Sequence, residues 1–404
     1  MSELSYLEKL LDGVEVEWKS LGEIATKIYS GGTPDTKRIE YWENGTIPWM
    51  SSGEVNLKNI ERTEKYITEA GLNNSSAKLV PRNSVVIALA GQGKTRGKVA
   101  RIRIALATNQ SLAALTFDEK KFSSDYVFHF LETQYESLRQ ISSGNSGRGG
   151  LNLQMISAYK IPIPCPGNPE KSLAIQSEIV RILDKFTALT AELTAELTAE
   201  LNMRKKQYNY YRDQLLSFKE GEVEWKTLGE VAVIGTGNHD TQDAIEHGKY
   251  IFYARGREPL KLNVFDFDET AIITAGDGAG VGKVFHYAKG KYALHQRAYR
   301  IVPNAFMNPR FVYHYITAYF FTYIQKASVS SSVTSLRRPM FLKFPIPVPP
   351  SEEQARIVEI LDKFDTLTNS ITEGLPREIE LRQKQYEYYR DLLFSFPKPE
   401  TVSN

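Results

Sequence analysis

The residues with the clearest chemical potential lie in two glycine-rich segments that end in Gly-Lys. Residues 93–95 form a GKT triplet in ALAGQGKT, and Lys283 follows a similar run in GDGAGVGKV. A nucleotide-binding phosphate loop also needs a glycine five residues before the second glycine of its motif, and those positions hold Ala88 and Asp277. Both segments therefore predict glycine-rich connections between strands, whose backbone can approach a phosphate closely, rather than sites of nucleotide hydrolysis.

Other catalytic patterns are missing from the sequence. The six histidines show no HExxH motif or paired metal-ligand spacing, and Cys165 has no second cysteine for a zinc site or a disulfide. The Asn/Asp-Pro-Pro-aromatic tetrapeptide typical of amino-group methyltransferases does not occur. A nuclease built on Asp35, Glu119 and Lys121 would rest on residue types that are common everywhere. We therefore expect no catalytic residue and no metal ligand in this chain.

Basic residues are concentrated in two blocks, although the overall formal charge is only +2. Residues 17–160 carry 19 Lys and Arg against 14 Asp and Glu, and residues 226–343 carry 15 against nine. Residues 70–117, inside the first block, contain seven basic residues and no acidic residue, and residues 278–351, which begin inside the second block and extend past it, contain ten and none. Such stretches are typical of a surface that contacts phosphates, and their recurrence favours nucleic acid over a merely solvated basic face.

Polar and basic residues in and near these blocks are the candidate DNA contacts. Asn109, Gln110, His295 and Gln296 could read base edges, although ordinary structural hydrogen bonds are the simpler role for any one of them. The full candidate set is Lys27, Gly31, Gly32, Thr33, Lys94, Thr95, Arg96, Lys98, Asn109, Gln110, Arg148, Arg255, Arg257, Lys283, His295, Gln296, Arg337 and Arg338.

The elements that position these residues are duplicated. Four sequence blocks recur in the same order: 16–25 (VEWKSLGEIA) at 223–232 (VEWKTLGEVA), 160–166 at 343–349, 179–190 at 357–368, and 204–218 at 382–396. Chance does not plausibly produce four matched blocks in register. The chain therefore consists of two equivalent halves with unlike bodies.

Two of the repeated segments have the periodicity of long amphipathic helices. Each spans about 45 residues, or roughly 65–70 Å, which is typical of a coiled-coil arm. Gly374 and Pro376 predict a kink in the second helix. The apolar stripe of the two spacer segments consists of Leu189, Leu193, Leu197, Leu201, Leu367, Ile371, Leu375 and Ile379.

The bodies between the repeats predict mixed α/β domains. Residues 84–102 and 270–288 both show a β-branched strand, a glycine-rich turn and GKV, and each body continues into an aromatic helix candidate. The opening YLEKLLDG resembles the end of the first long helix, which predicts a cyclic arrangement with the termini close together. The polar opening and short apolar runs predict neither a signal peptide nor a membrane span.

Together these features resemble the specificity subunits of type I restriction-modification enzymes, over essentially the whole chain. The TAELTAELTAEL run at 190–201 narrows the resemblance to the type IC subgroup. The segment at 31–51 looks like a loop-and-strand motif of recognition domains in this family, whereas the second domain has GTGNHDTQ nearby instead. The implied fold is α+β, with two α/β target recognition domains separated by two long antiparallel helices in a pseudo-twofold cyclic arrangement.

The resemblance also implies domain limits. They are an N-terminal recognition domain (1–165), a central helix with the TAEL repeats (166–219), a C-terminal recognition domain (220–349), a distal helix (350–396) and a disordered tail (397–404).

The resemblance implies a non-catalytic protein that binds a bipartite, asymmetric DNA sequence in the bacterial cytoplasm. Two modification subunits would dock on the helices, and restriction subunits would join them. S-adenosylmethionine, ATP and Mg²⁺ would be bound by those partners and no cofactor by this chain. A coiled-coil scaffold with protein-binding ends is the alternative, and an enzyme is a more distant one. The two basic domains argue against the scaffold, and a salt-sensitive shift of DNA would decide.

The TAEL repeat predicts a measurable change in spacing. Four residues add about 6 Å of rise and a net turn of about 40°, close to the roughly 35° between successive base pairs. The family resemblance implies the same link, and three repeats indicate a longer-spacer form. Deleting Thr198–Leu201 should shorten the nonspecific spacer of the methylated site and leave both half-sites unchanged. Methylation mapping that shows altered half-sites would refute this; mere low-complexity helix filler is the competing interpretation.

Overall fold

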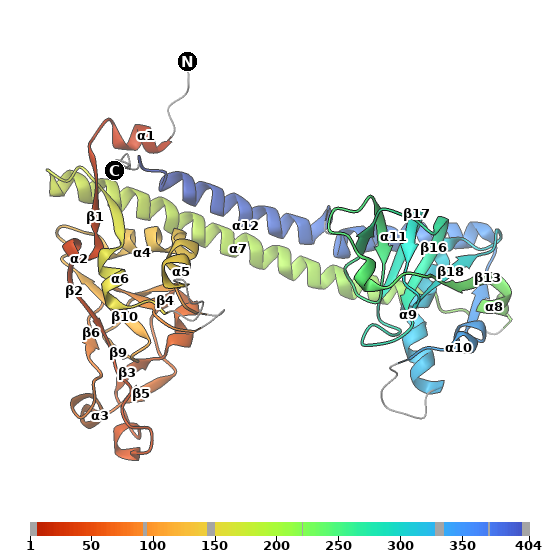
Figure 1. Ribbon diagram of the computed structural model, residues 1–404, viewed down its shortest axis with the longest axis horizontal. Coiled ribbons are helices and arrows are strands. Elements are labelled where there is room, and N and C mark those ends of the chain that lie inside the picture. The colour runs from red at the N-terminus through yellow and green to blue at the C-terminus, as the bar shows by residue number, and fades with distance from the viewer. Residues whose placement is uncertain are drawn as a thin grey trace. The chain divides into compact units, whose positions relative to one another are not determined.

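The computed structural model describes residues 6–91, 95–143, 150–219, 221–327, 335–370 and 372–397. The chain forms two compact units (Figure 1). Unit 1 comprises Met1–Thr194 and Leu381–Asn404, and unit 2 comprises Ala195–Glu380. Both long helical segments predicted from the sequence therefore contribute residues to both units. Within the described ranges, no helix combines the length and apolar character needed to cross a membrane.

Unit 1 contains three sheets flanked by short helices. A two-stranded sheet pairs β1 with β11, a five-stranded sheet has the order β2-β10-β7-β8-β4, and a four-stranded sheet has the order β5-β3-β9-β6. The strands are β1 (Val16–Ser20), β2 (Ala25–Ser30), β3 (Ile47–Met50), β4 (Asn59–Ile60), β5 (Lys65–Ile67), β6 (Leu79–Val80), β7 (Ser84–Ala88), β8 (Val99–Ile102), β9 (Leu106–Thr108), β10 (Leu112–Phe117) and β11 (Lys160–Pro164). The helices before the long one are α1 (Tyr6–Leu11), α2 (Leu21–Ile24), η1 (Ile39–Tyr41), η2 (Ser52–Leu57), α3 (Glu69–Asn73), α4 (Ser124–Thr133), α5 (Tyr135–Ser143) and α6 (Leu153–Ala158).

Strand β7 shows why this sheet forms the centre of unit 1. All five of its residues are buried, because both faces of the strand are covered. Val85 and Ile87 pack into the core that also contains Ile179 and Leu183 of the first long helical segment. Val86 and Ala88 pack into a second core on the other face of the sheet. The β-branched run SVVIA therefore alternates between two cores with the two-residue period of a strand.

Unit 2 has the same plan with a larger main sheet. β12 pairs with β19, and six strands form a sheet with the order β13-β18-β16-β17-β14-β15. The strands are β12 (Glu224–Thr227), β13 (Ala232–Thr236), β14 (Tyr250–Tyr253), β15 (Leu260–Leu262), β16 (Phe267–Ala275), β17 (Phe285–Leu294), β18 (Ala298–Pro303) and β19 (Pro345–Val348). The helices are α8 (Leu228–Val231), η4 (Thr241–Asp243), α9 (Pro309–Ala327), α10 (Arg338–Leu342) and α11 (Ser351–Asn369), with α7 (Pro169–Leu215) and α12 (Gly374–Leu393) passing between units.

We call the N-terminal part of α7 and the equivalent part of α11, which contain the repeated segments 179–190 and 357–368, the helix repeats. In unit 1, the helix repeat packs against the sheet domain through α4. Ile179 and Leu183 of α7 are fully buried in the shared core. The side-chain oxygen Oε1 of Gln176 accepts a hydrogen bond of 2.9 Å from the backbone amide of Ser123, the N-cap of α4. His129 Nε2 of α4 lies 2.9 Å from the carboxylate of Asp184. Apolar burial holds the helix to the domain, and the polar contacts fix its register.

Unit 2 repeats these contacts at the equivalent positions of its own helix repeat. Ile357 and Leu361 of α11 are fully buried. The side-chain oxygen Oε1 of Gln354 accepts a hydrogen bond of 2.7 Å from the backbone amide of Asn308, just before α9. His314 Nε2 of α9 lies 2.6 Å from Asp362. The duplication seen in the sequence is therefore a duplicated contact between a helix repeat and a domain.

Aromatic pairs join the two helical segments inside each unit. Phe186 stacks on Tyr389 in unit 1, with ring centroids 5.7 Å apart, and Phe364 stacks on Tyr211 in unit 2, with centroids 5.5 Å apart. Thr187 and Tyr386 share a hydrogen bond of 3.0 Å. These pairings confirm the predicted antiparallel direction of the helices.

The interruption predicted at Gly374 and Pro376 is a break between two helices and not a kink within one. The first long helix is continuous over 47 residues, but the second is divided into α11, which ends at Asn369, and α12, which begins at Gly374. Gly374 has a left-handed φ of +80°, and Pro376 cannot donate to the preceding turn, so the helix restarts rather than kinks. The side chain of Ser370 accepts hydrogen bonds from the amides of Thr372 and Glu373 at this break.

The predicted closeness of the chain ends is confirmed within unit 1. Leu7 and Leu11 of α1 share a core with Leu393 and Phe394 at the end of α12 (Figure 1), and Trp18 Nε1 donates to the carbonyl of Pro397 at 2.7 Å.

In unit 2 the uninterrupted chain fills the corresponding place. Leu216, just after α7, belongs to the core of unit 2 that also contains Ile357 and Leu361. Phe218 packs on Phe311 with ring centroids 6.5 Å apart. The two chain ends thus complete the core of unit 1, and a continuous segment after α7 completes the equivalent core of unit 2. Of the predicted tail, residues 398–404 lie outside the described residues.

The Asp184 contact predicts an acid-sensitive stabilisation of unit 1. Burial raises the pKa of the Asp184 carboxyl, but hydrogen bonds and charge from His129 and Arg101 outweigh this and lower it to about 2. A carboxyl with a depressed folded-state pKa stabilises the fold above its unfolded pKa of roughly 3.9, and the stability is lost as pH falls towards 2. Because the side chain is 39% exposed, we expect a contribution of about 1 kcal/mol at pH 7.

Asp184→Asn should therefore lower the unfolding temperature of unit 1 by roughly 2–4 °C at neutral pH. It should also flatten the fall in stability between about pH 4 and pH 2, measured by thermal unfolding across pH. Glu192→Gln, at an exposed position of the same helix, is the control and should behave as the wild type. Parallel acid profiles for Asp184→Asn and the wild type would contradict this role.

Candidate nucleic-acid interface

In unit 1, two predicted DNA-contacting segments meet directly after the strands that precede them. Residues 31–33 follow β2, and residues 109–110 follow β9. The amide of Gly32 donates to the carbonyl of Thr108 at 2.9 Å. The hydroxyl of Thr33 donates to the side-chain oxygen of Gln110 at 2.6 Å. We call residues 31–33 and 108–110 the unit 1 junction.

The unit 1 junction is built on a close backbone approach. A Cβ on Gly31 would lie 2.0 Å from the carbonyl oxygen of Thr108, so only glycine fits there. Trp49 Nε1 donates to the carbonyl of Gly32 at 3.0 Å and holds the loop from below. The side chain of Asn109 accepts from the amide of Ser111 at 3.1 Å and shapes the turn. Thr33 and Gln110 are exposed, so they are the side chains that the junction presents to solvent.

Unit 2 has a corresponding junction formed by residues 237–240 and 294–296. Residues 237–240 follow β13 as residues 31–33 follow β2. Residues 294–296 begin with the last residue of β17 and lead towards β18, as residues 108–110 begin with the last residue of β9 and lead towards β10. A Cβ on Gly237 would lie 1.8 Å from the carbonyl oxygen of Leu294. The backbone amide of Gln296 donates to the carbonyl of His239 at 2.9 Å, and its side-chain amide donates to Asp240 at 3.1 Å. The pair Asp240–Gln296 thus stands where Thr33–Gln110 stands in unit 1.

The ionisation states in the unit 2 junction follow from its hydrogen bonds. The backbone amide of Gln242 and the side chain of Gln296 donate to Asp240 and lower its pKa. Burial lowers the pKa of His295, so this ring is neutral at pH 7. Its Nδ1 accepts from the amide of Arg297 at 2.9 Å, and the proton of the neutral ring is therefore on Nε2.

Each junction contains a buried polar atom without a hydrogen-bond partner among the described residues. These atoms are Thr108 Oγ1 in unit 1 and His295 Nε2 in unit 2. His295 Nε2 lies 3.7 Å from the Asp240 carboxylate, which is beyond hydrogen-bond distance. Buried polar groups are normally paired, so unpaired donors and acceptors at both junctions are consistent with a ligand that completes them.

The sequence-based candidates include only His295 and Gln296 of the unit 2 junction, so Gly237, His239 and Asp240 were among the residues missed. GTGNHDTQ was set apart because it does not match the segment at 31–51. The usable signal was position, since both loops follow the repeated LGE(I/V)A segment by a few residues and both turns contain a Gln after matched strands.

Three further unit 1 candidates, Thr95, Arg96 and Lys98, lie in the loop between β7 and β8, beside the junction. The amide of Leu89 donates to the carbonyl of Ser111 at 2.8 Å, where this loop begins. Thr95 and Arg96 are only 8% exposed, which favours a structural role for both. Lys98 donates to the side chain of Asn56 at 2.7 Å.

Lys27 and the basic candidates of unit 2 occupy other places. Lys27 is exposed on β2 and lines a separate recess with Lys78. In unit 2 the structure gathers Arg255, Arg257 and Lys283 around one cavity. Arg337 and Arg338 follow Leu336, whose amide donates to the carbonyl of Gly276 at 2.7 Å, and both are exposed. Three candidates, Lys94, Arg148 and the spacer residue Ile371, lie outside the described residues.

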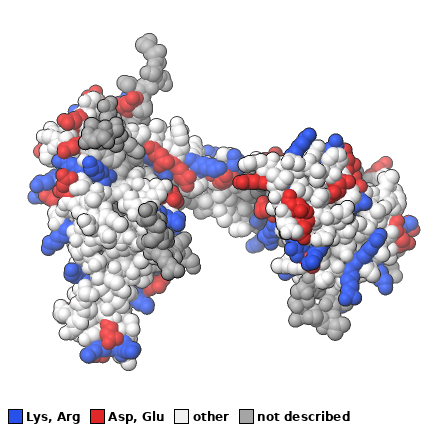
Figure 2. Space-filling view, in the orientation of Figure 1, with Lys and Arg blue, Asp and Glu red and all other residues white. Residues whose placement is uncertain are grey.

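The two sequence stretches without acidic residues do not form purely basic surfaces in the folded protein. Five of their arginines pair with carboxylates from other segments: Arg101 with Asp184, Arg103 with Asp125, Arg297 with Asp277, Arg300 with Glu269, and Arg310 with Asp362 and Asp365. On the face drawn in Figure 2, basic and acidic side chains are interspersed over both units. These five arginines are therefore occupied in structural ion pairs, and the basic side chains left at the junctions matter more than the stretches as a whole.

The seven described spacer residues form no deeply buried seam. Leu189 is 51% exposed, and the other six, Leu193, Leu197, Leu201, Leu367, Leu375 and Ile379, are half-buried. Across the described part of the chain, no three His, Cys, Asp or Glu side chains come together in a group that could hold a metal ion.

Comparisons with known proteins point to one family. The model of the type I restriction modification DNA specificity domain matches residues 13–203 and again residues 220–381. The EcoR124I/EcoR124II specificity subunit of a type I restriction enzyme from Escherichia coli is 43% identical and covers 100% of both chains. The EcoprrI specificity subunit from Escherichia coli is 40% identical over 92% of this chain and 93% of that protein.

A solved structure shares the fold at low sequence identity. It is a chain from work on complex assembly and conformational transition of the type I R-M system. It aligns with a TM-score of 0.62 at 15% identity over 94% of this chain and 97% of that chain.

The close approach in the unit 1 junction predicts a specific glycine requirement. Gly31→Ala would place a methyl group against the Thr108 carbonyl. The loop must then move, or the folded state must lose roughly 1–3 kcal/mol of stability. We expect a lower unfolding temperature and faster hydrogen exchange of the Gly32 amide. Gly53→Ala in the same unit is the control, because its nearest neighbour atom would be 3.9 Å away. Equal effects of the two substitutions would show that the junction is not tightly built.

Proposed function

The chain belongs to the family of type I restriction-modification DNA specificity proteins, and on this premise we propose that it directs a partner complex to a two-part DNA sequence. Each unit would recognise one half-site, and the chain would supply recognition and no chemistry of its own. The match of the family model to both halves of the chain supports one recognition domain in each unit. The type IC subgroup is our inference from the TAEL repeats at 190–201.

The observation that carries this proposal is the recurrence of one junction in both units. Gln110 and Gln296 occupy equivalent turns, and each is exposed and held by a polar neighbour from the preceding loop. A glutamine amide can donate and accept at the same time, as recognition of an adenine edge in the major groove requires. Thr33 and Asp240 add a hydroxyl and a carboxylate of different chemistry, which suits domains that read different bases.

Cations around the junctions suit contacts with the DNA backbone. In unit 2 these are Arg255, Arg257, Lys283, Arg337 and Arg338, all within segments that adjoin the junction or the 276–284 loop. Phosphate contacts position a protein on the duplex, whereas a few side chains at base edges specify the sequence. The same division of roles is our proposal for unit 1, with Lys27 and Lys98 as exposed or half-buried cations.

The partners follow from the same family. We propose that two modification subunits bind the two helix repeats, because a partner that fits one repeat meets the same side chains in the other. Restriction subunits would join them, and S-adenosylmethionine, ATP and Mg²⁺ would be bound by these partners. We also propose that the protein acts in the bacterial cytoplasm, where its DNA substrate is found.

Substitutions at the two junctions should act on different half-sites. Gln110→Ala should relax base preference in one half of the methylated sequence, and Gln296→Ala in the other half. Loss of a two-point contact to a base costs about 1–3 kcal/mol of discrimination. The measurement is co-expression of each variant with a modification subunit, followed by genome-wide mapping of methylated adenines.

Each variant is the control for the other, because the unaffected half-site reports a folded and assembled complex. If both substitutions altered the same half-site, the assignment of one half-site to each unit would be wrong. If neither changed the sequence preference, the junctions would not be the reading elements.

A further inference from the structure

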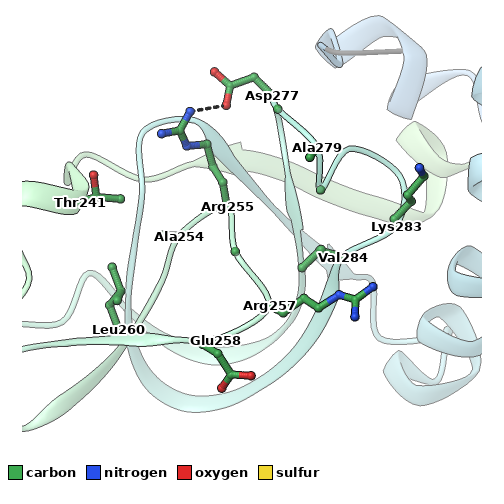
Figure 3. A pocket seen from close by; sticks show the side chains of 13 residues that line it. Thr241, Ala254, Arg255, Arg257, Glu258, Leu260, Asp277, Ala279, Lys283 and Val284 are labelled. Carbon is green, nitrogen blue, oxygen red and sulfur yellow. Dashed lines mark hydrogen bonds and ion pairs between the residues drawn. The ribbon is translucent and has the colours of Figure 1, made fainter. Parts of the chain in front are cut away.

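A cavity in unit 2 lies between the segment that follows β14 and the glycine-rich connection from β16 to β17 (Figure 3). Its volume is about 640 Å³, which exceeds a single phosphate group and suits a phosphodiester with part of its sugars. All three cations line the cavity. Figure 3 shows Arg255 and Arg257 on the first segment and Lys283 on the second. Two loops far apart in sequence thus bring three cations to one hollow.

The charge of this cavity is only partly neutralised. Arg255 donates to Asp277 at 2.9 Å, and Arg297, which adjoins the junction, donates to the other oxygen of the same carboxylate at 3.1 Å. Burial raises the pKa of Asp277, but these two hydrogen bonds outweigh burial and lower it, so the carboxylate is ionised. One carboxylate is therefore shared by two guanidinium groups. Arg257 and Lys283 are exposed, and the remaining acidic residue of the lining is Glu258.

Glycines hold the cavity walls together. A Cβ on Gly280 would lie 2.7 Å from the carbonyl oxygen of Arg255, so the two segments approach closely only because this residue is glycine. Gly278 has a left-handed φ of +81° and open space on its Cβ side. The connection therefore leaves room for a ligand oxygen beside the cations.

The cavity adjoins the unit 2 junction. Thr241, which lines it, directly follows Asp240, and the amide of Gly276 donates to the carbonyl of Arg297 at 2.8 Å, one residue after Gln296. A DNA strand whose bases face Gln296 must pass its backbone close by.

We propose that this cavity holds one backbone phosphate of the DNA half-site read by unit 2. Arg257 and Lys283 contact the phosphate, and Asp277 is a positioning residue that orients Arg255. The inference rests on the proposed function and assigns a role to residues that the base-reading model leaves open.

The first test measures salt dependence of DNA binding by the full complex with its modification subunits, on a duplex that carries the mapped site. Arg257→Ala and Lys283→Ala should each weaken binding roughly three- to tenfold and reduce the slope of log affinity against log salt by about one. Base preference should not change. Lys289→Ala is the matched control, because it removes the same charge near the opposite end of β16, beside Thr270, and should leave the slope unaltered.

The second test replaces single phosphates of the unit 2 half-site with uncharged methylphosphonates. One position should weaken the wild type, weaken Arg257→Ala less, and cause no further loss in the Arg257→Ala/Lys283→Ala double variant, since both contacts are then missing. Equal additional loss in wild type and double variant at every position would overturn the proposal. So would protection of the wild type against thermal unfolding by inorganic phosphate combined with a flat methylphosphonate scan, which would indicate a site for a free anion. A wild-type complex without preference for the mapped site would instead refute the proposed function.

Discussion

The contact on which each unit depends is the buried attachment of a helix repeat to the aromatic helix of its sheet domain. In unit 1 the carboxylate of Asp184 meets His129 and Arg101, and in unit 2 Asp362 meets His314 and Arg310. Desolvating these groups is costly, so each pair is favourable only in the geometry that satisfies its hydrogen bonds. Fully buried Ile and Leu side chains beside the pairs supply the apolar stabilisation. Because α4 packs on β7 and β8 and α9 packs on β16 and β17, the helix repeat also determines where the loops beyond those strands are presented.

The same constraint explains which parts of the halves are alike. Side chains in the attachment must complement partners on a second element, so a change at one position must be matched elsewhere. The exposed side chains of the junctions instead pair with each other, Thr33 with Gln110 and Asp240 with Gln296, and none of the four takes part in the attachment. Unit 1 can therefore present a hydroxyl at Thr33 and unit 2 a carboxylate at Asp240 on the same strand arrangement. Function in this protein resides in side chains carried by a repeated scaffold, as it does in many folds.

The sequence predicted the features that depend on periodicity or repetition. Helical spacing identified the long helix, and the repeats predicted the paired units and the closeness of the chain ends. Charge counting was less successful, because Arg101, Arg300 and Arg310 find carboxylates more than 30 residues away, and no linear pattern records that distance. The break before Gly374 was expected as a kink, since a Gly-Leu-Pro segment does not reveal whether the helix bends or restarts. The unit 2 junction was incomplete for a different reason: its loop shares a position after the repeated segment with the loop at 31–33, but no residue pattern marks Asp240 as the partner of Gln296.

The composition of the TAEL segment follows from how little of it is buried. Near the attachment, α7 contains Ile175, Ile179, Val180 and Ile182, β-branched residues that are unfavourable in an isolated helix but are compensated by core packing. Beyond it, Leu189 is half exposed and the leucines that follow are only partly covered, so tertiary packing contributes less. Ala, Glu and Leu, among the strongest helix formers, then hold the helix by local propensity, aided by pairs such as Glu200 with Arg204. A helix held in this way needs no specific neighbour at each position. Repeats can therefore be added to or removed from this segment without loss of the attachment contacts of Ile179 and Leu183, which lie outside it.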